Sequence, residues 1–221
     1  MTPEFVLYLL LISIGVVSYL AFENPLLKSR LLLKPTEIRA NNEYYRLITS
    51  GFVHADYLHL GFNLFVFHSF GKGLILTHYD QYGRFANESF LTLYGNLWPI
   101  FFIALFMLGV FVANIPSYFK NRFDPSYASL GASGGVSSIV FAFIIINPFH
   151  NLYLLFIPIG IPGIIFGILY LIFSHYQSRK KNDNINHEAH LWGAIFGVVF
   201  MLVTKPELTI KFYDQLINYR F

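Results

Sequence analysis

Long apolar stretches alternate with short polar ones along most of the chain. Six stretches are long enough for membrane-spanning helices, because about 20 mainly apolar residues cross a hydrocarbon core about 30 Å thick. The predicted helices cover residues 4–22, 57–77, 97–116, 132–147, 152–175 and 188–204. Lipid offers the backbone no hydrogen-bond partners, so each span must satisfy its own backbone groups. The pattern therefore predicts an all-α membrane bundle, with residues 1–221 forming one domain that ends in a short tail, 205–221.

Composition supports this class and excludes others. Hydrophobic residues make up 55% of the chain and charged residues 12%, whereas soluble domains contain about 25% charged residues. Cysteine is absent, which excludes disulfides, thiolate metal sites and a cysteine nucleophile. The net charge of +3 is small, so we expect contact with the lipid bilayer and no nucleic-acid partner. The first segment has no Lys or Arg before it and no small-residue cleavage site, which favours a retained helix over a signal peptide.

The connection between the first two predicted helices, residues 23–56, is unusually long and apolar. Leucine-rich runs alternate there with Lys28, Arg30 and Lys34. This alternation is typical of a segment that lies in the membrane interface with its apolar side down. We expect a half-embedded loop that braces one side of the bundle.

The fourth segment opens with small and polar residues, Gly131 to Ser138. At 1.5 Å per residue, residues 132–147 span about 24 Å, less than the hydrocarbon thickness. Asn147 and Pro148 fix the C-terminal end of this segment, so the missing length must lie at the N-terminal end, which carries Ser133. Ser133 is therefore predicted at the floor of a wet pocket, at a helix N-terminus whose free N–H groups favour negative charge.

The sixth segment carries a histidine beside a stripe of small residues. Ala189, Gly193 and Gly197 recur every four positions, a spacing that lets another helix approach backbone to backbone. His190 adjoins this stripe. If the fourth and sixth helices pack together, the Ser133 hydroxyl and the His190 imidazole can form a nucleophile and its general base. Glu188 points to a different side of the helix, so we expect a dyad with no third member.

The second helix supplies polar groups to the same region. His59 and Asn63 are four residues apart and therefore share one helical face. Together with the backbone N–H of Ser133, they can donate hydrogen bonds to developing negative charge. An interhelical hydrogen bond is the simpler interpretation of a lone histidine in a membrane helix.

A zinc site is a second interpretation of the histidines. His187 and His190 are three residues apart, but the zinc-protease motif needs H-E-x-x-H and the sequence is H-E-A-H. We expect no metal and no cofactor. The fifth segment contains Pro158, Pro162 and several glycines, which suggest a mobile gate or simply the usual frequency of these residues in membrane helices.

Taken together, these motifs resemble the rhomboid intramembrane serine proteases. The matching features are G-A-S-G at Gly131 to Gly134, A-H-x-x-G-x-x-x-G at Ala189 to Gly197, H-x-x-x-N at His59 to Asn63, and the aromatic-Arg pair Tyr45 and Arg46. They occur in the family's order across the six-helix core.

The resemblance implies a peptide-bond hydrolase that acts inside the membrane. Ser133 would be the nucleophile and His190 the base, with His59, Asn63 and the Ser133 backbone N–H as the oxyanion hole. The implied substrates are single-span membrane proteins, and the fifth helix would admit them.

The sequence departs from the family pattern at two positions. Many relatives carry an aromatic residue one turn after the serine, against which the histidine ring rests, and here that residue is Ser137. Many also carry a glutamate late in the second helix, which is absent from Gly71 to Ile75. The first departure leaves the support of the His190 ring open.

The sequence leaves two other functions open. A catalytically silent rhomboid-like protein would bind membrane-protein clients, and a small transporter would need charged residues inside its helices, which the predicted spans lack.

The connections on the side of the predicted site hold ten of the 15 Lys and Arg residues, which by charge alone favours the cytoplasm. The family resemblance instead implies a bacterial inner membrane with the site opening outside the cytoplasm.

Overall fold

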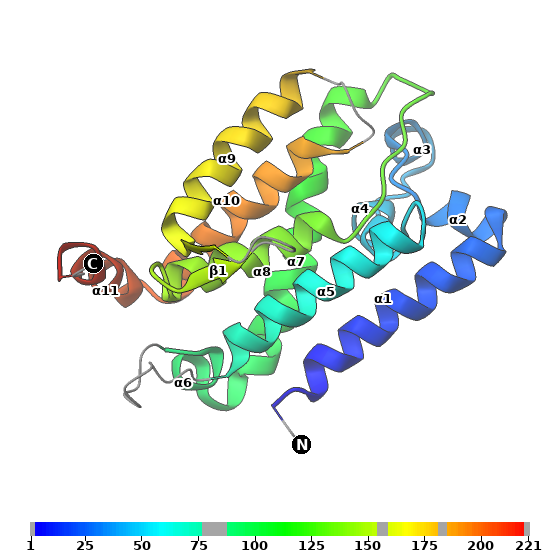
Figure 1. The fold of residues 1–221 in the computed structure, drawn as a ribbon. Helices are drawn as coiled ribbons and strands as arrows, with labels where there is room; N and C mark the ends of the chain where they lie inside the picture. The colour runs from blue at the N-terminus through cyan, green and yellow to red at the C-terminus, as the bar shows by residue number, and fades with distance from the viewer. Residues whose placement is uncertain (1–2, 77–87, 154–158, 181–184, 219–221) are drawn as a thin grey trace.

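The computed structural model describes residues 3–76, 88–153, 159–180 and 185–218, and these are mostly helical. Each of the six predicted segments overlaps a long helix (Figure 1). These are α1 (Phe5–Glu23), α5 (Tyr57–Ile75), α7 (Trp98–Asn121), α8 (Ser133–Ile146), α9 (Gly163–Lys180) and α10 (His187–Thr204). The last residue of the predicted second helix, Thr77, lies outside the described residues.

The helical class is as predicted, but the described residues give three candidate spans in place of six. By length and apolar composition, α1, the stretch Phe90–Asn121 and α10 can cross a membrane. The stretch Phe90–Asn121 joins α6 (Phe90–Tyr94), the short 3-10 helix η2 (Gly95–Leu97) and α7. Ser133–Ile146 is a shorter apolar helix.

Helix α8 forms the centre of the bundle. Every residue from Gly134 to Ile146 is buried, and α5, α7, α9 and α10 all contact the helix (Figure 1). The small residues of α8 lie at its N-terminal end, where neighbouring helices can pack closely against it. The large apolar residues lie at its C-terminal end and fill the hydrophobic core. The core beside it includes the stacked rings of Phe67 and Phe106, whose centroids are 4.6 Å apart.

The contact between α8 and α10 is close because glycines line it, as the small-residue stripe predicted. A Cβ atom added at Gly193 would stand 2.8 Å from the carbonyl carbon of Gly134, and one added at Gly197 would stand 2.8 Å from the Cα of Ser138. Both distances are shorter than side-chain contacts allow. Only residues without a side chain therefore permit this approach of the two backbones.

The first loop folds into four short helices that contact the rest of the bundle. They are α2 (Pro25–Leu31), α3 (Pro35–Asn41), α4 (Arg46–Thr49) and the 3-10 helix η1 (Ser50–Phe52). Buried Arg46 holds the loop together, because it donates to the carbonyls of Ser29 and Leu32, each at 2.9 Å, and pairs with Glu43. The loop also packs against α1, α7 and α8, in agreement with the bracing role expected of it, whereas its depth in the membrane stays a prediction.

The loop also pairs directly with the segment that leads into α8. Leu33 and Ser129 exchange backbone hydrogen bonds of 2.9 and 3.0 Å in an isolated antiparallel bridge. Ser129 lies four residues before Ser133. The first loop therefore fixes the approach to the predicted nucleophile.

The predicted boundaries of the fifth helix were wrong. The helix runs from Gly163 to Lys180, and the residues before it form a hairpin of β1 (Asn151–Tyr153) and β2 (Gly160–Pro162). The strands are antiparallel, with Asn151 opposite Pro162. Proline disfavours helical geometry in the residue before it, so the helix begins only after Pro162. Residues 154–158, including Pro158, lie outside the described residues.

The predicted tail contains one more helix, α11 (Glu207–Asn218), at the C-terminal edge of the bundle (Figure 1). Leu208 is buried, while Ile210, Tyr213 and Ile217 are exposed. An apolar surface on a helix with charged neighbours suits the membrane interface.

Candidate active site

Ser133 is the first residue of α8, and Gly131 shapes the turn before it. Gly131 has a φ of 116°, in the region that favours glycine. A Cβ atom there would stand 3.0 Å from Nε2 of His59 and 4.0 Å from Oγ of Ser133. The missing side chain of Gly131 therefore leaves the space between His59 and Ser133 open.

His54 anchors the residue before Ser133, a role that the sequence analysis missed. The His54 ring is fully buried, and its Nε2 accepts a 3.2 Å hydrogen bond from the Ala132 N–H. Ser18 donates its hydroxyl proton to the Phe52 carbonyl, so the 2.8 Å contact between Ser18 Oγ and His54 Nδ1 must be donated by the imidazole. The ring is thus neutral and joins α1 to the serine turn. Its only signal in the sequence is a histidine placed five residues before His59.

This buried histidine predicts acid sensitivity. Burial, chiefly, and the neighbouring His59 lower the pKa of His54 to about 3; Lys28 also lowers it, and Asp56 opposes the shift. The unfolded chain has a histidine pKa of about 6.5 and so binds the proton first. The stability that neutral His54 contributes is complete above about pH 6.5 and is lost as the pH falls toward 3.

We therefore expect the melting temperature of the detergent-purified protein to fall as the pH is lowered from 7 to 5. The slope due to this one group approaches about 1.4 kcal/mol per pH unit. His54→Gln cannot titrate, so its melting temperature should fall less steeply over the same range, from a lower starting value. Equal slopes for the two proteins would assign the acid sensitivity to other groups.

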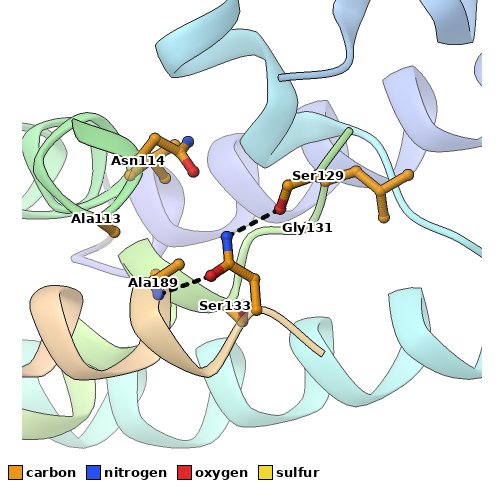
Figure 2. A pocket seen from close by; sticks show the side chains of 10 residues that line it. Ala113, Asn114, Ser129, Gly131, Ser133 and Ala189 are labelled. Carbon is orange, nitrogen blue, oxygen red and sulfur yellow. Dashed lines mark hydrogen bonds between the residues drawn. The ribbon is translucent and has the colours of Figure 1, made fainter. Parts of the chain in front are cut away.

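The start of α10 is tied to the same turn. Asn186 caps the helix by accepting the Ala189 N–H at 3.1 Å, and its amide donates to Ser129 Oγ at 3.0 Å. Both bonds are drawn beside Ser133 in Figure 2. One asparagine therefore connects the helix that carries His190 with the turn that carries Ser133.

Ser133 and His190 are each next in sequence to a residue at the crossing of α8 and α10. A Cβ atom at Gly134 would stand 3.5 Å from the carbonyl oxygen of Ala189, so the residues next to Ser133 and His190 contact each other. A cavity of about 10 Å³ lies beside Ser133, lined also by Gly134 and Ala189 (Figure 2). That volume holds about one water molecule.

The predicted oxyanion donors lie on α5, which packs against α8. Asn63 is buried, and its amide donates one hydrogen bond of 2.9 Å to the His59 carbonyl, which leaves a second N–H of the amide. His59 Nδ1 accepts a long bond, 3.5 Å, from the Ala55 N–H. The neutral ring therefore carries its proton on Nε2, which lies on the side of the ring next to Gly131.

Two further possibilities that the sequence raises are Glu188 as a third catalytic residue and a metal site at the histidines. Glu188 pairs with Lys120 of α7 at 3.4 Å, in agreement with its predicted direction away from the dyad. Within residues 3–76, 88–153, 159–180 and 185–218, no group of three or more His, Cys, Asp or Glu residues is placed to hold a metal ion. The zinc interpretation thus gains no support from the described residues.

Comparison with known proteins gives the family. The sequence profile of the Rhomboid domain matches residues 41–207. The chain is also similar to RHOMBOID-like protein 12, mitochondrial, of Arabidopsis thaliana, with 24% identity over 213 residues that cover 89% of this chain. The match spans 57% of that relative's length. The relative is described as mitochondrial, so it does not support the expected bacterial inner membrane. Because the profile match covers most of the sequence, this multi-pass integral membrane protein belongs to the rhomboid family.

Proposed function

We propose that the protein is an intramembrane serine endopeptidase that cleaves membrane proteins in or near their transmembrane segments. The observation that carries the proposal is the glycine-lined crossing of α8 and α10, where the residues next to Ser133 and His190 contact each other. Acyl transfer by a serine needs at least the nucleophile and a general base, and here the two candidates come from adjoining, closely packed helices.

In the proposed mechanism, His190 removes the proton of the Ser133 hydroxyl while Oγ attacks the carbonyl carbon of the scissile bond. The carbonyl oxygen gains negative charge at the N-terminus of α8, where the backbone N–H of Ser133 lacks a helical partner. Nε2 of His59 and the second N–H of Asn63 can donate to the same oxygen. His190 then protonates the departing amine, and water hydrolyses the acyl-enzyme.

The direct test is reaction of the detergent-purified protein with a fluorophosphonate probe, followed by mass spectrometry of the labelled peptide. We expect one probe group, attached to Ser133, and no labelling after heat denaturation. An absence of labelling in folded protein, together with no cleavage of a transmembrane substrate, would reject the protease proposal in favour of the silent binding protein.

The oxyanion role of Asn63 has its own test. Asn63→Ala should lower the cleavage rate about 100-fold or more, because a donor to the transition-state oxyanion contributes on that scale. Its buried amide also bonds within α5, so the melting temperature must be measured in parallel. A rate within about twofold of the unmodified protein would show that Asn63 only packs.

A further inference from the structure

The imidazole of His190 lies between two other rings. The Tyr170 ring from α9 stacks on it with 6.3 Å between centroids and 19° between planes. His187, one turn earlier on α10, meets it edge-on at 5.7 Å. A stacked partner restricts rotation of the imidazole about its side-chain bonds, which keeps a base aimed in one direction.

Tyr170 is itself held by α8. Its hydroxyl forms a 2.7 Å hydrogen bond with Ser137, one turn after Ser133, and its ring packs against Phe141 of the same helix at 5.5 Å. Ser137 is buried. A small hydroxyl-bearing residue at this position leaves room for a ring from another helix and bonds to its tip.

We propose that Tyr170 is a positioning residue for His190, with its ring supporting the imidazole and Ser137 fixing the ring. This inference rests on the proposed function, because it assigns a role in orienting the catalytic base. It accounts for Ser137 at the position where an aromatic residue was expected: α8 supplies the hydrogen bond and α9 supplies the ring.

The arrangement makes α9 part of the site without contributing a reacting group. Phe173, one turn after Tyr170, meets His187 edge-on at 5.6 Å, so α9 contacts both histidines at the start of α10. The orientation of His190 thus depends on the packing of α8, α9 and α10 together.

The test compares the limiting inactivation rate and the apparent binding constant of the fluorophosphonate probe in variants of the full chain. Tyr170→Leu should lower the limiting rate about tenfold while the binding constant stays unchanged, because the ring orients the base and does not bind the probe. Tyr170→Phe keeps the ring and should recover most of the rate. Leu171→Ala is the packing control: Leu171 is also partly buried against the core, but lies about 100° further round α9.

The hydrogen bond is tested by a double-mutant cycle. Tyr170→Phe and Ser137→Ala remove the same bond, so each should lower the limiting rate about two- to threefold, which is less than the loss in Tyr170→Leu. The double variant should then be no slower than the slower single variant. Additive losses would overturn the proposed link between Ser137 and Tyr170. If Tyr170→Leu does not fold, this cycle decides the proposal.

The two proposals fail in different ways. A folded, unmodified protein that neither labels nor cleaves a transmembrane substrate overturns the protease proposal, and the positioning role with it. Normal labelling of the unmodified protein, with an unchanged rate in Tyr170→Leu or an equal loss in Leu171→Ala, overturns the positioning role alone. Selective loss in Tyr170→Leu with recovery in Tyr170→Phe supports it.

Discussion

Ser133→Ala is expected to abolish fluorophosphonate labelling and to lower cleavage of a transmembrane substrate by about 10⁴-fold or more, because the proposed acyl-enzyme forms on Ser133. His190→Ala should cause a loss of the same order, since the hydroxyl then has no base. The two residues act as one unit, so the double variant should be no less active than either single variant. Quantitative labelling and substrate cleavage in detergent provide the measurement.

The control for this prediction is Ser138→Ala, which removes a hydroxyl from the same helix. The Ser138 hydroxyl lies within hydrogen-bond distance of two carbonyl oxygens inside the bundle, those of Leu105 and Gly135, and has no place in the proposed chemistry. Its variant should still label at Ser133. Melting temperatures close to that of the unmodified protein are expected for Ser133→Ala, because the change removes one oxygen atom beside a small cavity. Persistent labelling in Ser133→Ala would mean that another residue is the nucleophile.

Gly197→Leu should harm both the fold and the activity. The new side chain would overlap the backbone of Ser138, including its carbonyl oxygen, and a backbone cannot move aside as a flexible side chain can. The helices α8 and α10 must separate, which moves His190 away from Ser133. Overpacking of this kind costs about 3 kcal/mol, so the melting temperature should fall by about 10 °C. Thermal melting and labelling of the purified variant measure the two effects.

Gly61→Leu is the matched control for Gly197→Leu. It makes the same substitution in a helix of the bundle, but a Cβ atom at Gly61 has no atom within 4 Å. The melting temperature of this variant should therefore stay within a few degrees of the unmodified protein. If Gly197→Leu melted and labelled normally, the close packing of α8 and α10 could not be what positions the dyad.

The long helices and the α8–α10 contact were predictable because their signals are local. A long apolar segment predicts a helix, because in lipid the backbone can form hydrogen bonds only within its own segment. The spacing of Ala189, Gly193 and Gly197 marks one face of α10 as a contact surface, whichever helix packs against it. The start of α9 was missed because apolar length was given more weight than Pro162, whose effect on its neighbour is also local.

The roles of His54 and Tyr170 were not predictable in this way. His54 meets Ala132 across 78 positions of sequence, and Tyr170 meets Ser137 across 33. Neither distance leaves a periodic pattern, because the partners come from different elements whose packing decides the contact. In the sequence alone, Ser137 leaves the His190 ring without the aromatic neighbour that many relatives supply at this position. The role of Ser137 becomes clear only when its hydrogen bond with Tyr170 of another helix is known.

The burial of α8 has a consequence for how lipids can influence this protein. A bilayer acts on a helix through the surface that acyl chains touch, and a mismatch in thickness is relieved by tilting such helices or by deforming the membrane. The residues from Gly134 to Ile146 present almost no such surface. Thinner or thicker membranes should therefore tilt the outer helices first, while the depth of Ser133 follows its protein neighbours.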